Sequence, residues 1–123
     1  MAWLVKDEQV LASLEIADSP KKRMRGLLGR AELKGAAMLL APARGVHTFG
    51  MRFPLDIAFC DADLVVLEIR TVPAHRLTRP RFRARQVIEA EAGAFARWEV
   101  QVGDVLDVRV READDSDGSA ARR

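Results

Sequence analysis

The clearest pattern in the chain is a period-two alternation of apolar and polar residues between His47 and Cys60. The apolar positions are Phe49, Met51, Phe53, Leu55, Ile57 and Phe59, and the polar positions between them include Thr48, Arg52 and Asp56. Such alternation predicts a β-strand with one face in a core and the other free to act. Because Pro54 lacks an amide donor, we expect an edge strand, a bulge, or two strands joined at a bend. Arg52 and Asp56 are then predicted to share an outward surface, with His47 as the one polar member of the apolar row.

Shorter apolar runs flank this segment on both sides. Residues 3–5 and 10–17 predict an opening hairpin, residues 36–41 form a compact apolar run, and residues 64–72, 86–90 and 105–111 predict further strands. Asp18 and Ser19 followed by Pro20 predict a short helix over residues 20–28, and residues 91–98 predict a brief helical turn. Several short strands with frequent turns favour a mainly β fold, a small barrel- or sandwich-like domain with one or two short helices.

Length and composition allow one compact unit. With 123 residues, of which 49% are hydrophobic, the chain can bury a single core. We expect one β-rich domain over residues 1–111 and a disordered tail of small and charged residues over 112–123. The formal charge is +2 and the tail is acidic overall, so the body has a modest basic surplus. A surplus of this size does not by itself indicate a nucleic-acid partner.

Other features narrow the class of protein. The single cysteine, Cys60, excludes an intramolecular disulfide, and its place in an apolar strand predicts a small buried hydrophobe. Residues 1–10 lack the apolar core of a signal peptide, and no window approaches the about 20 apolar residues that span a bilayer. We therefore expect a soluble, cytoplasmic protein. His47, Cys60 and His75 are too widely spaced to predict a metal site, and nothing indicates a cofactor.

The central alternating segment concentrates the chemistry of a candidate site. If residues 52–56 stayed extended at about 3.3 Å per residue, Arg52 and Asp56 would lie about 13 Å apart, so a shared pocket requires a bend or a third group. In one interpretation Arg52 holds an anionic group, Asp56 accepts a hydrogen bond and His47 titrates near neutral pH. In the other, Asp56 binds loop amides, Arg52 is solvated, and His47 is a satisfied histidine at the strand mouth.

Two basic stretches offer alternatives. Lys21 to Arg30 carries cations around two glycines but lacks the spacing of a Walker loop or a dinucleotide fingerprint, and a solvated helix face explains it as well. The second stretch is free of acids and contains Arg70, His75, Arg76, Arg79, Arg81, Arg83 and Arg85. If extended, Arg79 to Arg85 would point four arginines to one side around Phe82. That stripe suits a nucleic-acid backbone, although with one aromatic a solvated, charge-protected edge is the simpler reading.

Four stretches together resemble the uncharacterised prokaryotic family called domain of unknown function 192. They are Arg25-Gly-Leu-Leu-Gly-Arg30, the run from His47 through Pro54-Leu55-Asp56 to Asp61, Val87-Ile-Glu-Ala-Glu-Ala-Gly93, and Val102-Gly-Asp104. The resemblance implies a small, mainly β domain with no established biochemical activity. Many relatives carry a Trp-Met-Lys-Asn-Thr type segment at residues 47–51, so no role of that lysine or asparagine transfers to this chain. Arg25, Asp56, Glu89 and Gly93 match the family pattern.

Three functional hypotheses follow. The leading one is a binding or accessory module for a small polar or anionic ligand, or a peptide, whose site residues are Arg25, His47, Arg52, Asp56 and Glu89. An enzyme would instead use His47 with Asp56 or Glu89 as acid and base, within hydrogen-bond reach of each other. A nucleic-acid-binding protein would use Arg79 to Arg85. The sequence leaves the oligomeric state open and predicts no membrane partner.

Overall fold

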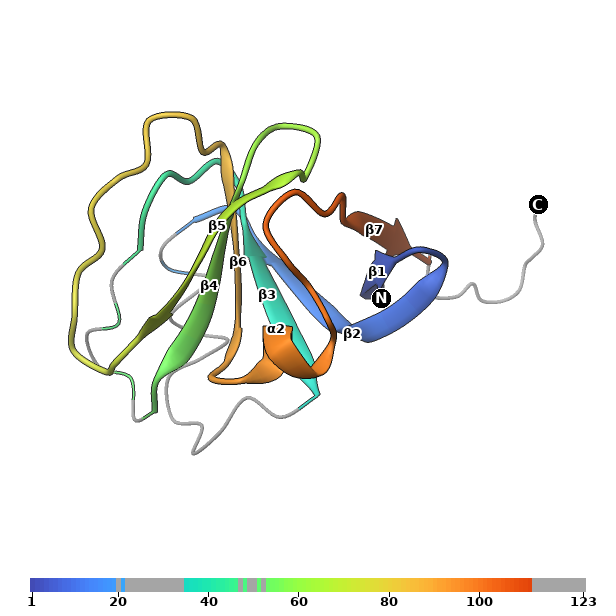
Figure 1. The fold of residues 1–123 in the computed structure, drawn as a ribbon, viewed down its shortest axis with the longest axis horizontal. Coiled ribbons are helices and arrows are strands. Elements are labelled where there is room, and N and C mark those ends of the chain that lie inside the picture. Colours follow the sequence, from blue (N-terminus) through green and yellow to red (C-terminus); the bar gives the residue numbers. More distant parts are fainter. Residues whose placement is uncertain (20, 22–34, 47, 49–50, 52, 112–123) are drawn as a thin grey trace.

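The structure, a computed structural model, describes residues 1–19, 21, 35–46, 48, 51 and 53–111. The described strands are β1 (Ala2–Lys6), β2 (Gln9–Ala17), β3 (Ala36–Leu40), β4 (Leu55–Cys60), β5 (Val66–Val72), β6 (Gln86–Glu91) and β7 (Asp107–Val110). They form one sheet in the order β5-β4-β6-β3-β2-β1-β7, with the short helix α2 (Ala94–Arg97) at one end (Figure 1). The expected mainly β class is confirmed. The helix expected over residues 20–28 and the tail over 112–123 lie outside the described residues, Lys21 apart.

The opening hairpin forms where the alternation predicts it. β1 and β2 pair antiparallel, and Lys6 faces Gln9 across a two-residue turn. Asp7 and Glu8 both have positive φ, at 50° and 66°, which is the geometry that matches the natural twist of paired strands. β2 then runs parallel to β3, and every other pairing in the sheet is antiparallel. Residues 36–40, within the apolar run of the sequence, supply the central strand β3.

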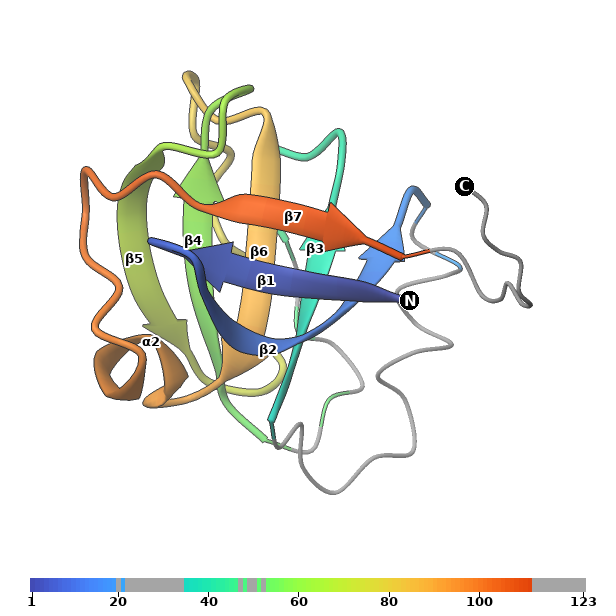
Figure 2. The same cartoon turned by 90° about the vertical axis from the view of Figure 1, so that its right-hand side faces the viewer.

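The sheet is strongly curved but is not closed into a barrel. Its two edge strands are β5 and β7, and β1 and β7 pass across the face of the central strands (Figure 2). The segment leading into β7 reaches the start of β5, because the Val66 amide donates to Asp104 O at 2.8 Å and the Leu106 amide to Leu64 O at 3.0 Å. The sheet therefore does not close as a full barrel would. Its two ends are joined by these bonds, by the Gly103 amide donating to Val66 O at 2.8 Å, and by an isolated bridge between Val65 and Val105.

The curved sheet separates two apolar clusters, one on each face. The first is enclosed by the curled β1–β2 hairpin and α2, and it centres on Leu4, Ile88 and Phe95. The second lies on the opposite face and includes Met38, Leu55, Ile57, Phe59 and Val87. Together they leave the sheet centre buried on both faces, as in a two-layer arrangement.

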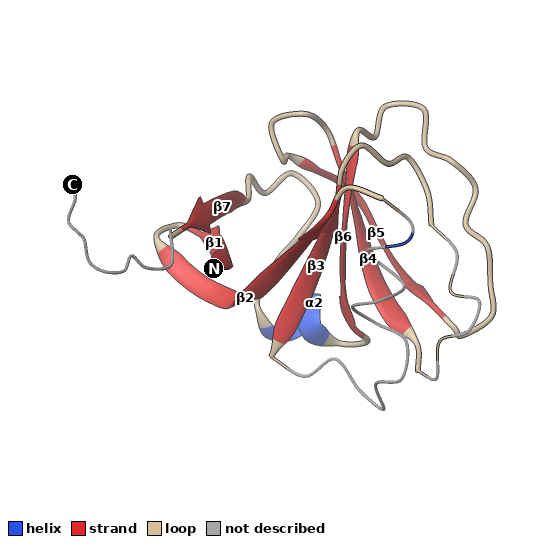
Figure 3. Ribbon diagram, turned by 180° about the vertical axis from the view of Figure 1, so that it is seen from behind, coloured by secondary structure: helices blue, strands red, loops and turns tan. Residues whose placement is uncertain are grey.

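Two loops cover the second cluster. Residues 41–46 and 73–85 run side by side over it, joined by backbone bonds such as Ala43 N to Arg85 O at 2.9 Å and Arg81 N to Arg44 O at 2.8 Å (Figure 3). Gly45 permits this approach, since a Cβ there would lie 3.1 Å from Thr78 Oγ1 and 3.3 Å from Pro80 Cα. The loop 73–85 thus packs on the body of the protein through buried Ala84.

Candidate functional site

Strand β4 begins only after Pro54, and all six of its residues are buried. It pairs with β5 on one side and β6 on the other, so it is not an edge strand. A bend lies at Phe53, but none of the described residues between Thr48 and Pro54 belongs to a strand, so the two strands joined at a bend are not observed and the predicted strand begins only at Leu55. The expectation of a free outer face is wrong for residues 55–60. One face of β4 packs in the second cluster through Leu55, Ile57 and Phe59, and the other packs in the first cluster through Ala58 and Cys60.

Asp56 lies inside the protein, with 4% of its surface exposed. Its Oδ1 accepts a hydrogen bond from Thr71 Oγ1 at 2.7 Å, and its Oδ2 accepts from the amides of Gly93 at 2.9 Å and Phe95 at 3.4 Å. The carboxylate therefore joins β4 and β5 to the turn that follows β6. This corresponds to the simpler of the two sequence interpretations, in which Asp56 binds loop amides.

Gly93 makes that arrangement possible. Its φ of 91° lies in the left-handed region that favours glycine, and it directly precedes α2. The turn aims the Gly93 and Phe95 amides at the carboxylate, and these are donors that a helix start leaves without intrahelical partners. Phe95 and Trp98 then pack edge to face, with ring centroids 5.8 Å apart.

Glu89 is also buried, with no exposed surface, but it lies on the other face of the sheet. β4 and β6 pair with Asp56 opposite Ala90 and Ile57 opposite Glu89, and residues paired in register share a face. Asp56 thus lies on the face of the first cluster, beside Ala90. Glu89 lies on the face of the second cluster, beside Ile57. Glu89 is engaged in an interaction there. The two carboxylates do not converge, so a pocket holding His47 could contain only one of them.

The remaining predicted site residues, Arg25, His47 and Arg52, lie outside the described residues. Their ligand-binding role, and the acid–base role of His47, stay predictions. Their neighbour Thr48 is fully buried and joins its own segment to the covering loop 73–85. Its hydroxyl donates to Pro73 O at 2.7 Å and accepts from the Arg76 amide at 2.7 Å.

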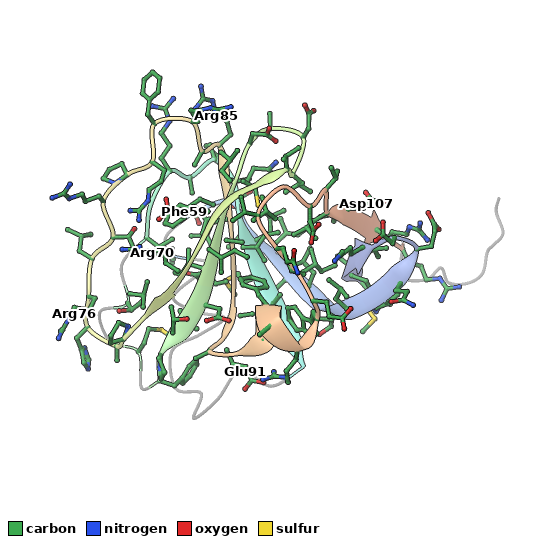
Figure 4. All side chains as sticks on the ribbon, in the orientation of Figure 1. Phe59, Arg70, Arg76, Arg85, Glu91 and Asp107 are labelled. Atoms are coloured by element: carbon green, nitrogen blue, oxygen red, sulfur yellow. The ribbon has the colours of Figure 1, made fainter. Side chains whose placement is uncertain are left out.

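A groove lies between β5 and the loop that follows it, and four arginines are among the residues that line it. Its volume is about 720 Å³, within the range of small-molecule sites. It is lined by Arg70, Thr71, Val72, Pro73, Arg76, Leu77, Thr78, Arg79, Pro80 and Arg81. We call it the arginine groove. The labelled side chains of Arg70 and Arg76 lie toward the same side of the molecule in Figure 4.

Arg81 is the one lining arginine with a tightly bound partner. Its Nε and Nη2 each donate to Glu68 at 3.0 Å, and its guanidinium lies 4.4 Å from the ring centroid of Phe59. The hydrogen bonds from Arg81 lower the pKa of Glu68, and the carboxylate raises that of Arg81. This pair attaches the covering loop to β5.

The other lining arginines are less engaged. Arg70 lies 3.5 Å from the same Glu68 carboxylate and has 61% of its side chain exposed. Within the described part of the chain, no ion pair involves Arg76 or Arg79. Of the four lining arginines, only Arg70 and Arg81 lie beside a carboxylate among the described residues, and it is the same one, that of Glu68. The sequence feature that indicated these arginines was the acid-free stretch from Arg70 to Arg85. From the sequence, however, Arg79 to Arg85 were expected to form a straight stripe and not to line a groove.

That stripe does not form as expected. Residues 79–85 are a loop with a turn at Phe82 and Arg83, and no strand. Arg81 turns to Glu68, and Arg85 Nη1 donates to Phe82 O at 3.0 Å and Ala84 O at 2.9 Å. The four arginines are thus not one extended row, while contact with nucleic acid stays a prediction.

Cys60 is buried as the sequence predicts. Burial, assisted by the nearby Asp61 carboxylate, raises the pKa of its thiol to about 12. Among the described residues no group of three His, Cys, Asp or Glu side chains is placed to hold a metal ion, and no described helix is long and apolar enough to cross a membrane.

Comparison with known proteins places the chain among uncharacterised relatives. The model of the DUF192 family, described as "Uncharacterized ACR, COG1430", matches residues 3–108. The UPF0127 protein TK1120 of Thermococcus kodakarensis is 29% identical over 98 residues, which cover 76% of this chain and 62% of that protein. A UPF0127 protein of Thermococcus gammatolerans is 29% identical over 104 residues, covering 80% of this chain and 68% of the relative. The chain thus spans about two thirds of the length of these two relatives.

Solved structures share the fold. A Sinorhizobium meliloti protein described as a candidate transcription regulator matches with a TM-score of 0.72 at 24% identity, covering 87% of this chain and 91% of that one. A protein of unknown function from Novosphingobium aromaticivorans matches with a TM-score of 0.68 at 23% identity, covering 86% and 82%. At these identities the likeness concerns the fold and not the activity.

Proposed function

This chain belongs to the DUF192 family, and we propose that it is a binding module for a small anionic ligand, which it holds in the arginine groove. The observation that carries the proposal is the charge of the groove. Arg70, Arg76, Arg79 and Arg81 line it, and Glu68 is the one carboxylate bonded to any of them among the described residues. Clefts lined by one sign of charge concentrate counter-ions of the opposite sign.

The chemistry of the lining side chains favours an oxyanion. A guanidinium presents a planar fork of donors that fits carboxylate and phosphate groups with paired hydrogen bonds. The two hydroxyl groups of the groove are already committed, because Thr71 donates to Asp56 and Thr78 exchanges bonds with the backbone of Val46. Arg76 and Arg79 are therefore the polar groups that a ligand would meet first.

The apolar lining sets the shape of the ligand. The groove lining also contains the apolar residues Val72, Pro73, Leu77 and Pro80. Proline residues restrict the backbone, and the Arg81–Glu68 bond anchors the end of the wall. The groove is thus largely formed without its ligand, which lowers the entropic cost of binding.

Titration calorimetry with inorganic triphosphate and with citrate tests the proposal. We expect both anions to bind at low ionic strength and to bind more weakly as salt is added. Arg76→Gln and Arg79→Gln should each weaken binding about tenfold, the effect of losing one charge-assisted bond of about 1.5 kcal/mol. The matched control is Arg111→Gln, which removes the same charge from an exposed residue beyond β7.

The outcomes separate the candidate sites. No binding by the unmodified protein, or equal weakening by the Arg111 control, would contradict the proposal. If Arg52→Gln or His47→Ala abolished binding while Arg79→Gln left it intact, the site would instead be the cluster predicted from the alternating segment. Activity screens with the His47 variant address the enzyme hypothesis in the same preparation.

A further inference from the structure

The residue directly after the wall of the arginine groove is an exposed aromatic. Phe82 follows Arg81 in the chain and is 84% exposed, the largest exposed fraction among the exposed large hydrophobic residues of the described part. We propose that the anion bound in the groove is the phosphate of a nucleotide, whose base stacks on the ring of Phe82. This inference rests on the proposed function, since it names the ligand class of the same groove.

The exposure of Phe82 is imposed by a well-anchored turn. The Ala84 amide donates to Arg81 O at 3.0 Å, and the Arg85 amide donates to Cys60 O at 2.8 Å. Ala84 itself has no exposed surface, so the turn is fastened to the body at its base. Arg85 Nη1 also bonds Phe82 O at 3.0 Å, which holds the backbone that carries the ring. The ring is thus presented outward by a fixed backbone.

Keeping a phenylalanine in water forgoes the stabilisation that its burial would provide. In contrast, Phe59 and Phe95 are buried in the two clusters. An exposed aromatic face beside cations is the combination that binds nucleotides, because every base has a π-face that can stack while the phosphates meet guanidinium groups. Fixing the backbone that carries the ring in advance reduces what is lost in ordering this turn on binding.

The spacing along the chain suits a ligand with both groups. Arg79 precedes Phe82 by three residues, which span at most about 11 Å of extended chain. Arg83 follows Phe82 immediately and is exposed. A base on the ring would therefore have cationic side chains before and after it, and the groove continues from Arg79 toward Arg76 and Arg70.

The experiment compares ligands that differ only by the nucleoside. Calorimetry with ATP and with inorganic triphosphate measures what the base contributes. We expect the protein to bind ATP about tenfold more tightly, the lower range for stacking one base on an aromatic side chain. Phe82→Ala should remove this preference and leave triphosphate affinity unchanged, and Phe82→Trp should retain it. Val102→Ala, at an exposed valine outside the groove lining, is the control.

A second arm distinguishes the source of the nucleotide. If a short oligothymidylate binds more tightly than ATP, with a steeper salt dependence, the ligand is a single-stranded nucleic acid. If ATP binds at least as tightly as the oligothymidylate, the ligand is a free nucleotide. Both results support the inference.

Other results would overturn it. Triphosphate binding with no preference for ATP, or a preference that survives Phe82→Ala, would leave the proposed function standing and refute the nucleotide. Phe82-dependent sedimentation with phosphatidylglycerol vesicles, without ATP preference, would also refute it, since the ring would then contact lipid. Absence of binding to triphosphate and ATP alike would remove both the inference and the proposed function.

Discussion

Replacing Asp56 tests whether its carboxylate is the anchor between the sheet and the turn before α2. The side chain is 4% exposed and accepts three hydrogen bonds, from the Thr71 hydroxyl and the amides of Gly93 and Phe95. Asp56→Ala removes both carboxylate oxygens, and with them the acceptors of all three bonds. Thr71 and Gly93 are exposed residues, so water can reach their donors in the variant. Phe95 is 1% exposed, and we expect its amide to be left without a partner.

The size of the effect follows from these contacts. An unpaired buried amide costs about 1 to 3 kcal/mol, and each of the other bonds to a charged acceptor contributes about 1 kcal/mol or more beyond what water returns. We therefore expect Asp56→Ala to lower the free energy of unfolding by about 3 to 5 kcal/mol. That is a large part of the about 5 to 15 kcal/mol that holds a domain of this kind together.

Asp56→Asn should behave very differently. Its amide oxygen can still accept from the Gly93 and Phe95 amides, and its NH₂ group can donate to the Thr71 hydroxyl, which is able to act as acceptor. The geometry survives and the loss is that of the negative charge, so we expect about 1 to 2 kcal/mol.

Urea denaturation followed by tryptophan fluorescence measures both variants. Trp98 packs on Phe95 at the end of α2 and reports on this part of the protein. Hydrogen exchange at the Phe95 amide should be faster in Asp56→Ala than in Asp56→Asn. A loss below about 1 kcal/mol for Asp56→Ala, or equal losses for the two variants, would refute the assigned anchoring role.

Two further predictions concern titratable groups. Burial raises the pKa of the Cys60 thiol to about 12, so the folded protein should resist iodoacetamide at pH 8 and react only when urea unfolds it; rapid labelling of the folded state would contradict the burial. Hydrogen bonds from Arg81 lower the pKa of Glu68, so its contribution to stability is present above the ordinary carboxyl pKa and is lost as pH falls through the lowered value. Glu68→Gln should therefore flatten the acid side of a curve of unfolding free energy against pH. An unchanged slope would show that Glu68 does not contribute to the acid dependence of stability.

Local patterns predicted most of the fold because they depend on neighbouring residues. The strands over residues 2–6, 9–17, 55–60, 66–72, 86–91 and 107–110 fall within or close to the predicted runs, and α2 falls within the predicted helical turn. The apolar run at residues 36–41 could not be placed, since a strand buried on both faces loses its alternation. The parallel pairing of β3 with β2 joins residues 13–17 to residues 36–40, and no pattern within either stretch indicates its partner strand.

The candidate site was less predictable. Alternation correctly put Asp56 on the opposite side of β4 from Leu55 and Ile57, but burial of the whole strand removed the free face. Glu89 was grouped with Asp56 by residue type, whereas the register of β4 with β6 puts them on opposite faces. The acid-free window did identify the arginines that line the groove, and the bend at Phe82 then changed which of them lie together.

The amino-acid sequence alone determined most of the segments that become strands, that Cys60 is interior, and where positive charge gathers, because each depends on side-chain type and spacing along one stretch of chain. Only the tertiary structure decided what each strand face meets. Asp56 meets the amides of Gly93 and Phe95, more than thirty residues away, and Arg81 meets Glu68 across a loop. Such contacts follow from strand register and from the curvature of the sheet, which bring together residues that no local pattern relates.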